Sequence, residues 1–340
     1  MSAIADVARL AGVSKATASR ALSGRGYVSP GTRARVAEAA AEIGYVVSSN
    51  ASSLVTGQSK NVGVVLPFIN RWFFAELLEG IEEALIEADY DLTLYRLTDD
   101  PEQRRKVFEY FLVRKRVDAV IAVSVALTAS EVVRLRSLDK PLVGVGGPVE
   151  GMSTLSIDDE AAARLATEHL LSLGHARVVH LGGDLHAQMA FFVHAKRLAG
   201  YRAAMDADPR GLEARFATAD FTIDGGFRSA MHLLADPRTR PTAVFAASDE
   251  IAIGTILAAR QLGIAVPAEL SVAGIDGHAL APLFGLTTIE QHPRAAGPRR
   301  PWRWCSRGSR PAGPRSAPCT TPVDFAARTS TTAPPAPPTP

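Results

Sequence analysis

The side chains with the clearest chemistry lie in the second of two short helices expected at the N-terminus. Lys15 and Arg20 are cations, and Thr17 and Ser19 place small hydroxyl groups between them. Two short helices joined by a glycine turn, the second rich in small polar and basic groups, are typical of a helix-turn-helix that reads DNA. We therefore predict that this chain is a DNA-binding regulator.

The residues around this helix predict how it is held. The first helix is indicated by apolar residues at the i, i+3, i+4, i+7 spacing of one helix face, namely Ile4, Val7, Ala8 and Ala11. Gly12 can end that helix and Ser14 can cap the next one. A third helix is expected over 30–43, with Ser29 as its cap. Residues 1–45 thus form an all-α DNA-binding domain.

The charge of the chain is distributed unevenly. Residues 1–60 carry a net charge of +4, residues 293–340 carry +7, and the body between them carries −9. A basic head on an acidic body indicates that affinity for nucleic acid belongs to the head. Without the helix-turn-helix pattern, a charge of +4 would be ordinary surface scatter.

Several classes of protein are not favoured by the sequence. Cys305 and Cys319 have no disulfide or metal-ligand spacing. The first apolar residues alternate with Asp6 and Arg9, unlike a secretory signal, and no apolar run approaches the roughly 20 residues of a membrane span. We expect a cytoplasmic, nucleoid-associated protein without a metal, a cofactor or a membrane partner.

Residues 46–60 have two interpretations. Their serine-rich composition is that of a flexible linker. Alternatively, a short helix over about 48–55 forms on DNA and presents Leu54 to the minor groove, where an apolar side chain pushed between base steps kinks the duplex.

From residue 61 the chain alternates between buried strands and amphipathic helices. Strands are expected at 62–67, 91–97, 119–125, 141–146, 177–182, 243–247 and 271–275, and helices at 73–88, from 101, and at 159–173, 194–205, 225–234 and 250–262. Apolar strands separated by helices form parallel sheets covered on both faces. Residues 61–292 are therefore expected to form two doubly wound α/β lobes, with a ligand cleft where the strand C-termini meet.

Several separate motifs resemble one family. They are Asp6–Arg20, Val28-Ser29, Thr32-Arg33, Gly44-Tyr45, the hinge residues Ala51 and Leu54, Gly174-His175, Arg197–Tyr201, Ser248-Asp249, Gly274–Asp276 and Thr287–Gln291. Together they resemble the lactose-repressor (LacI/GalR) family of transcription factors over residues 3 to 292. The resemblance implies a homodimeric repressor of a palindromic operator, with a core similar to periplasmic binding proteins and a sugar or nucleoside effector.

The resemblance also implies which residues contact DNA. Lys15 and Ala16 open the recognition helix, where Lys15 can donate to guanine and Ala16 can contact only an apolar group such as a thymine methyl. Further family positions near the duplex are Ser14, Thr17, Ser19, Arg20, the loop residue Tyr27, and Ala51 and Leu54 of the hinge.

For the effector, the resemblance assigns an aromatic set and a charged pair. Phe73 and Phe74 correspond to positions at the cleft mouth, Phe221 to a stacking platform, and Arg197 and Asp276 to the pair that binds polar groups of the ligand. An apolar sugar face packs on aromatic rings, and a polyol edge needs fixed charged donors and acceptors. By residue type alone, the three phenylalanines would be core residues and the charged pair would lie on the surface.

The last segment, 293–340, departs from the pattern. It holds twelve of the 22 prolines, both cysteines and eight arginines, and it has no helical or strand periodicity. In relatives this region supplies an amphipathic helix and a final strand. Its composition resembles a GC-rich coding sequence read out of frame, so we hypothesise a frameshift near residue 293 and expect an irregular, disordered tail. The alternative is a genuine basic tail that adds nonspecific affinity for phosphates.

Three other classes of function remain to be weighed. An enzyme is not favoured, because the chain has no Gly-x-Ser-x-Gly, Walker or His-Glu-x-x-His motif. A transport-type sugar-binding protein would have a signal peptide and no DNA-binding head. A regulator that has lost effector response or dimerisation stays open because of the tail.

Overall fold

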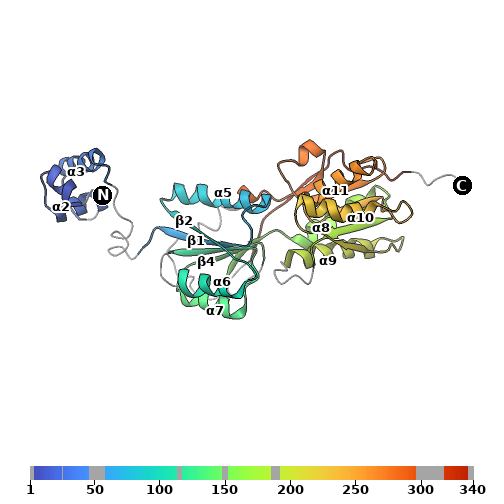
Figure 1. The fold of residues 1–340 in the computed structure, drawn as a ribbon, viewed down its shortest axis with the longest axis horizontal. Helices are drawn as coiled ribbons and strands as arrows, with labels where there is room; N and C mark the ends of the chain where they lie inside the picture. Colours follow the sequence, from blue (N-terminus) through green and yellow to red (C-terminus); the bar gives the residue numbers. More distant parts are fainter. Residues whose placement is uncertain are drawn as a thin grey trace. The chain divides into compact units, whose positions relative to one another are not determined.

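The chain folds into a small helical unit and a larger α/β unit, which are described separately (Figure 1). The smaller unit contains residues 1–61 and 115–118, and the larger contains 62–114 and 119–340. The computed structural model describes residues 4–24, 26–45, 58–112, 117–147, 152–184, 192–295 and 318–335.

The helical unit has the three predicted helices. They are α1 (Ile4–Leu10), α2 (Lys15–Ser23) and α3 (Pro30–Glu42). The caps are confirmed: Ser14 Oγ accepts from the Thr17 backbone N–H at 3.1 Å, and Ser29 Oγ accepts from that of Thr32 at 3.3 Å. Gly12 adopts a φ of 64°, in the left-handed region that glycine enters without a steric penalty. The small core consists of Val7, Ala8, Ala11, Ala18, Ala21, Val36, Ala39 and Ala40.

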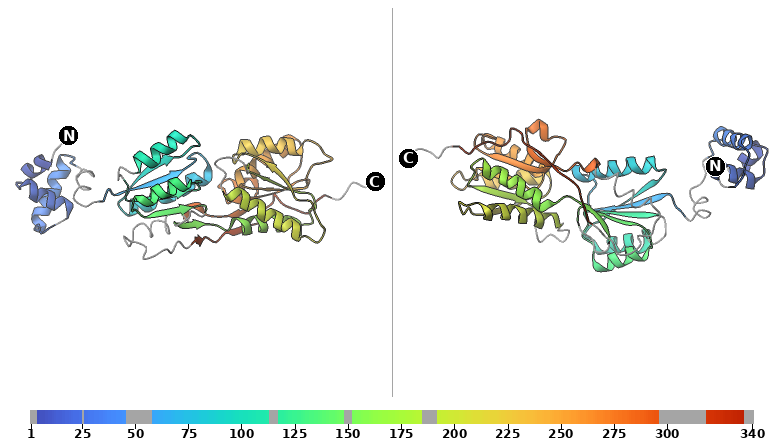
Figure 2. Two further views of the ribbon diagram at one scale, coloured as in Figure 1. Left: turned by 90° about the horizontal axis from the view of Figure 1, so that it is seen from below. Right: turned by 180° about the vertical axis from the view of Figure 1, so that it is seen from behind.

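The first lobe of the larger unit is a six-stranded sheet with strand order β11-β5-β4-β3-β1-β2. Its strands are β1 (Asn61–Leu66), β2 (Asp91–Arg96), β3 (Ala119–Val123), β4 (Leu142–Val145), β5 (Ser153–Ser156) and β11 (Pro318–Thr320). Helix α5 (Trp72–Glu87) covers one face, and α6 (Pro101–Lys106), a π-helical turn (Val107–Phe111) and α7 (Ala129–Ser137) lie on the other (Figures 1 and 2). The strand pairs β1–β3, β3–β4, β4–β5 and β5–β11 are all parallel.

The second lobe repeats this plan with strand order β12-β10-β9-β8-β6-β7. Its strands are β6 (Val178–Gly182), β7 (Arg215–Thr218), β8 (Ala243–Ala246), β9 (Ser271–Asp276), β10 (Thr287–Glu290) and β12 (Asp324–Ala326), with a 3-10 turn at Ala281–Phe284. Helices α8 (Asp159–Ser172) and α9 (Phe192–Ala207) pack on one face, and α10 (Ile223–Leu234) and α11 (Asp249–Gln261) on the other. Two doubly wound parallel lobes are thus confirmed.

The chain passes between the two lobes at three places. It does so after β5, after β10, and between β11 and β12. The Thr321 N–H donates to the Ser156 carbonyl at 2.9 Å, and His292 Nε2 lies 2.9 Å from an oxygen of Asp324, so these segments are bonded to one another. After β10, Arg294 forms ion pairs with Glu79 and Glu83 of α5.

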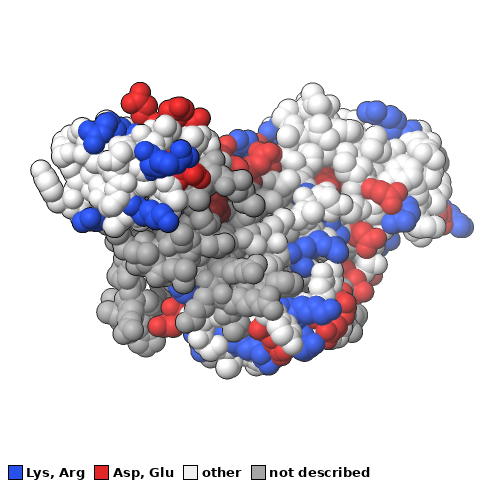
Figure 3. Space-filling model, turned by 60° about the vertical axis from the view of Figure 1, so that its left-hand side comes forward, with Lys and Arg blue, Asp and Glu red and all other residues white. Residues whose placement is uncertain are grey.

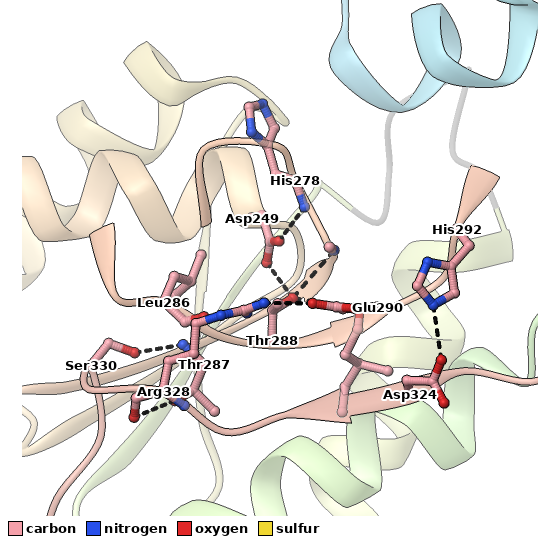
Figure 4. A network of polar contacts seen from close by, with 12 residues as sticks. Asp249, His278, Leu286, Thr287, Thr288, Glu290, His292, Asp324, Arg328 and Ser330 are labelled. Atoms are coloured by element: carbon pink, nitrogen blue, oxygen red, sulfur yellow. Dashed lines mark hydrogen bonds and ion pairs between the residues drawn. The ribbon is translucent and has the colours of Figure 1, made fainter. Parts of the chain in front are cut away.

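The described part of the C-terminal tail, residues 318–335, is mostly irregular as predicted, but it contains two three-residue strands that the sequence does not predict. There β11 extends the first sheet in parallel with β5, and β12 pairs antiparallel with β10. Beyond β12, Arg328 forms an ion pair with Glu290 at 2.6 Å, and Ser330 accepts a hydrogen bond from the Thr287 N–H (Figure 4). Sheet edges supply partners for backbone groups, so short strands form here without a hydrophobic period.

Further differences concern short elements. Helix α7 and strands β5, β7 and β10 are not among the predicted elements. The three strands have only four residues each, and such short strands with polar residues carry too little periodicity to be recognised. The hinge-helix interpretation, with Ala51 and Leu54, concerns residues outside those that the structure describes.

The surface charges and the helix lengths can be compared with what is expected of a DNA-binding protein and of a membrane protein. On the face drawn in Figure 3, acidic and basic side chains are interspersed rather than gathered into one large field. Within the described residues, no helix combines the length and the apolar character needed to cross a membrane.

A buried carboxyl group connects three elements of the second lobe. Asp249, in the first turn of α11, is 0% exposed and accepts hydrogen bonds from Thr288 Oγ1 at 2.6 Å and from the His278 N–H at 2.8 Å (Figure 4). Burial raises the pKa of Asp249, the nearby Asp276 raises it further, and the two hydrogen bonds oppose that rise. The folded protein therefore ionises Asp249 less readily than the unfolded chain does.

This raised pKa predicts a pH-dependent loss of stability. The favourable contribution of Asp249 is complete below the unfolded value of 3.8 and is lost as the pH rises through the folded pKa. We expect Asp249→Asn to remove this dependence, so that its unfolding free energy gains more than about 1 kcal/mol on the wild type between pH 4 and pH 8. Urea denaturation across that range measures the difference. Asp206→Asn, at an exposed carboxylate, is the matched control, and parallel curves for Asp249→Asn and wild type would contradict the account.

Candidate functional site

The recognition-helix residues predicted from sequence lie together on α2. Lys15, Ala16, Ser19 and Arg20 are exposed, whereas Ala18 and Ala21 face the small core. This division follows from helix periodicity, because core contacts use one face of α2 and leave the other to solvent. The exposed face holds two cations and one hydroxyl group beside the alanine.

Three of the predicted side chains form local hydrogen bonds. Ser14 Oγ caps the helix and lies 2.9 Å from Thr17 Oγ1. Arg20 donates from Nε to the Ala16 carbonyl at 3.2 Å, which keeps its side chain along the helix. Tyr27, in the following loop, is 91% exposed, so no core packing accounts for this aromatic side chain.

A cavity lies between the two lobes of the larger unit. It encloses about 900 Å³, counting the part open to solvent. Side chains from both lobes and from the three connecting segments line it, as expected at the carboxyl ends of parallel strands. All five predicted effector residues are among those lining side chains: Phe73, Phe74, Arg197, Phe221 and Asp276.

Arg197 is the centre of a buried charge network in this cavity. It is 4% exposed, its Nε donates to Asp159 at 2.9 Å, and one terminal nitrogen lies 3.7 Å from Asp276. The same nitrogen donates to the Ala247 carbonyl, and Gln291 donates to Asp276. Burial raises the pKa of Asp276, while Arg197 and the Gln291 hydrogen bond oppose that rise.

The aromatic residues of the cavity also pack against the hydrophobic cores of the lobes. Phe74 is 8% exposed and packs in the core between α5 and the first sheet, with the ring of Phe73 at 5.4 Å in an edge-to-face arrangement. Phe221 packs against the α10 and α11 core and lies 4.5 Å from the ring of His194. Burial, then the charge of Arg197, lowers the pKa of His194 to about 4, so this imidazole is neutral at pH 7.

By residue type alone, the phenylalanines are expected in the core and the charged pair on the surface, and the structure agrees with only the first expectation. The phenylalanines do pack in hydrophobic clusters, but they also line the cavity. Arg197 and Asp276 are buried rather than on the surface, because each gives the other a counter-charge and each has further hydrogen bonds. Those of Arg197 are with Asp159 and the Ala247 carbonyl, and that of Asp276 is with Gln291.

Several residues that line the cavity are not among the predicted effector residues. Ser124, Ser156 and Ser248 lie at or just after the carboxyl ends of β3, β5 and β8. A polar residue directly after a buried strand is the signal that points to such positions. The charged residues Arg71, Asp159 and Glu250 give no comparable signal, because each opens a helix, where polar residues are ordinary.

Both units match known protein families. Residues 3–48 match the family of "Bacterial regulatory proteins, lacI family", and residues 59–296 match "Periplasmic binding proteins and sugar binding domain of LacI family". The Catabolite control protein A of Priestia megaterium is 32% identical over 85% of this chain and 87% of its own. The ribose operon repressor of Escherichia coli K12 is 34% identical over 86% and 88%.

A solved structure extends the likeness to the fold of nearly the whole chain. The Lac repressor dimer bound to operator and the anti-inducer ONPF has a TM-score of 0.82 and 25% identity, covering 98% of this chain and 99% of that one. The family matches span both units, and the two curated relatives exceed 30% identity over most of their length. The chain belongs to the LacI family of bacterial regulatory proteins.

Proposed function

We propose that this protein is a homodimeric repressor that binds a palindromic operator and is controlled by a carbohydrate in the cavity between its lobes. The observation that supports the effector site most directly is the buried pair Arg197 and Asp276 beside the three lining phenylalanines. Fixed charged donors and acceptors next to aromatic faces suit a ring that is apolar on its faces and hydroxylated at its edge.

On DNA, Lys15 and Ala16 are proposed to contact base edges in the major groove. Ser14, Thr17, Ser19, Arg20 and Tyr27 lie around them and position the head on the duplex. Ala51 and Leu54 are proposed to act in the minor groove as a hinge helix. Two heads about 34 Å apart enter successive major grooves, which is why the protein must act as a dimer.

Control requires coupling between the cavity and the hinge. Three connecting segments join the lobes, so a ligand that bridges the lobes favours one angle between them. That angle biases the 46–60 segment between ordered and disordered states. The ligand shifts DNA affinity only by its differential affinity for the two states, typically about 1–3 kcal/mol.

The DNA-reading role of Lys15 predicts a loss of specificity. Lys15→Ala should weaken binding to the palindrome upstream of the protein's own gene by about 10- to 100-fold, the value of one base contact. Arg35→Ala removes one exposed charge from α3 of the same head and is the matched control. Fluorescence anisotropy with operator and with random duplex measures the ratio of affinities. An unchanged ratio for Lys15→Ala would refute its assignment to the bases.

The effector role of Arg197 predicts a protein that binds DNA but no longer responds. Arg197→Ala should keep operator affinity and lose the change in affinity caused by ligands found in a thermal-shift screen of sugars and nucleosides. Because removing this buried cation leaves two carboxyl groups unpaired, at a cost of about 3–5 kcal/mol, Arg197→Gln serves as a second variant.

The control for this measurement lies on the same helix. Arg202→Ala removes an exposed arginine of α9 and should respond to ligand as the wild type does. If operator release persists in a folded Arg197 variant, the cavity is not the effector site.

A second candidate function is a regulator that has lost effector response or dimerisation through a frameshift. The family match ends at residue 296, whereas residues 318–326 add strands to both sheets. We therefore propose that the out-of-frame stretch is bounded, from about 296 to 317, and that the reading frame is restored before β11.

This proposal predicts two compensating frameshifts at the locus. Resequencing should reveal an alternative frame across codons 296–317 that encodes an amphipathic helix, with the existing frame resuming by codon 318. If neither other frame carries a helical apolar period, the frameshift is excluded and the tail is a genuine one. Size-exclusion chromatography of the present chain then distinguishes a dimer from a regulator that has lost assembly.

A further inference from the structure

Arg71 lines the same cavity without any predicted role. It directly precedes α5 and lies on the first lobe, close to the cavity residues Phe73 and Phe74. Its guanidinium carbon is 3.5 Å from the ring centroid of Phe68, so one flat face of the cation rests on an aromatic ring. In this geometry the N–H groups at the edge of the guanidinium remain available to a ligand.

No described residue satisfies those N–H groups. Within the residues that the structure describes, the Arg71 side chain has neither a hydrogen bond nor an ion pair, although it is half-buried. Burial lowers the pKa of Arg71, and the charges of Glu250 and Asp220 oppose that change. A guanidinium nevertheless stays charged at neutral pH.

The other cations of the cavity are differently placed. Arg197 already forms ion pairs with Asp159 and Asp276, and the nitrogen that faces Asp276 also donates to the Ala247 carbonyl. His194 is neutral, as its lowered pKa shows. Among the described lining residues, Arg71 is thus the cationic side chain that has no ion-pair partner.

The nearby carboxyl groups do not neutralise Arg71 by contact. Asp220 has a side chain that is 74% exposed and lies 3.5 Å from Arg228. Glu250 lines the cavity on the second lobe, where burial and then Asp276 raise its pKa to about 7, so it is protonated in a large share of molecules at neutral pH. A protonated Glu250 donates a hydrogen bond to an anion instead of repelling it.

These contacts favour one ligand chemistry over another. A neutral sugar would leave a half-buried cation without a counter-charge, which is unfavourable in a cavity with an apolar lining. A carboxylate or phosphate accepts two parallel hydrogen bonds from a guanidinium, and such charge-assisted bonds are about twice as strong as neutral ones. We propose that Arg71 determines specificity in this cavity by binding the carboxylate or phosphate of an anionic sugar, an inference that rests on the proposed carbohydrate effector.

Matched neutral and acidic probes test this inference on the full chain. The probes are glucose, gluconate and glucose 6-phosphate, together with ribose and ribose 5-phosphate, measured by isothermal titration calorimetry. In at least one set the acidic member should bind more than about tenfold more tightly than its neutral counterpart. Gluconate against glucose 6-phosphate distinguishes a carboxylate from a phosphate.

Three variants separate the role of Arg71 from general charge effects. Arg71→Gln should abolish the preference for the acidic probe while leaving the affinity for the neutral sugar within about twofold. Arg202→Gln, which removes an exposed arginine on α9, should retain the preference. Glu250→Gln should retain or strengthen binding of the acidic probe, whereas a cationic ligand would lose affinity in this variant.

The outcomes distinguish this inference from the proposed function. If a neutral sugar binds as tightly as its acidic partner and releases the operator, the carbohydrate effector stands and the role of Arg71 is overturned. Persistence of the acidic preference in Arg71→Gln, or equally tight binding of inorganic phosphate alone, would also overturn it. If no probe of either kind binds, both proposals fail.

Discussion

The buried network around Arg197 is the interaction on which the larger unit depends. A guanidinium that is 4% exposed is tolerable only with counter-charges, and Asp159 and Asp276 provide them. Asp159 opens α8, directly after a connection between lobes, and Asp276 ends β9. Through Gln291 the network also reaches the second connection. One cation therefore links the cavity wall to two of the three segments that connect the lobes.

The third connection comes from the part of the chain with the least recognisable sequence. Residues 318–332 bond to both lobes, through β11, β12 and the contacts of Arg328 and Ser330 (Figure 4). His175 is 1% exposed, and its Nε2 lies within hydrogen-bond distance of the Ser271 hydroxyl and 2.8 Å from the Thr332 carbonyl oxygen. The second lobe is thus stabilised in part by a segment that follows its other strands along the chain.

The helical head follows a different principle. Its core is built mainly from alanine and valine, so little apolar surface is buried, and the caps at Ser14 and Ser29 contribute a larger share of its stability. Small core residues also let α2 pack closely while keeping Lys15 and Arg20 in solvent. Tyr27, in the loop after α2, is left almost fully exposed.

The sequence by itself determined the helix-turn-helix and the two α/β lobes, and it predicted five effector residues that all line the cavity, because periodicity, caps and family motifs are local properties of the chain. For Ser124 and Ser156 the sequence offers only a weak indication, namely that each is a polar residue at the end of a buried strand. The burial of Arg197 and the raised pKa of Asp249 depend on groups far apart in sequence. Only the tertiary structure decided these, and it also assigned β11 and β12, since a strand of three residues is stabilised by the sheet edge that it joins rather than by its own pattern.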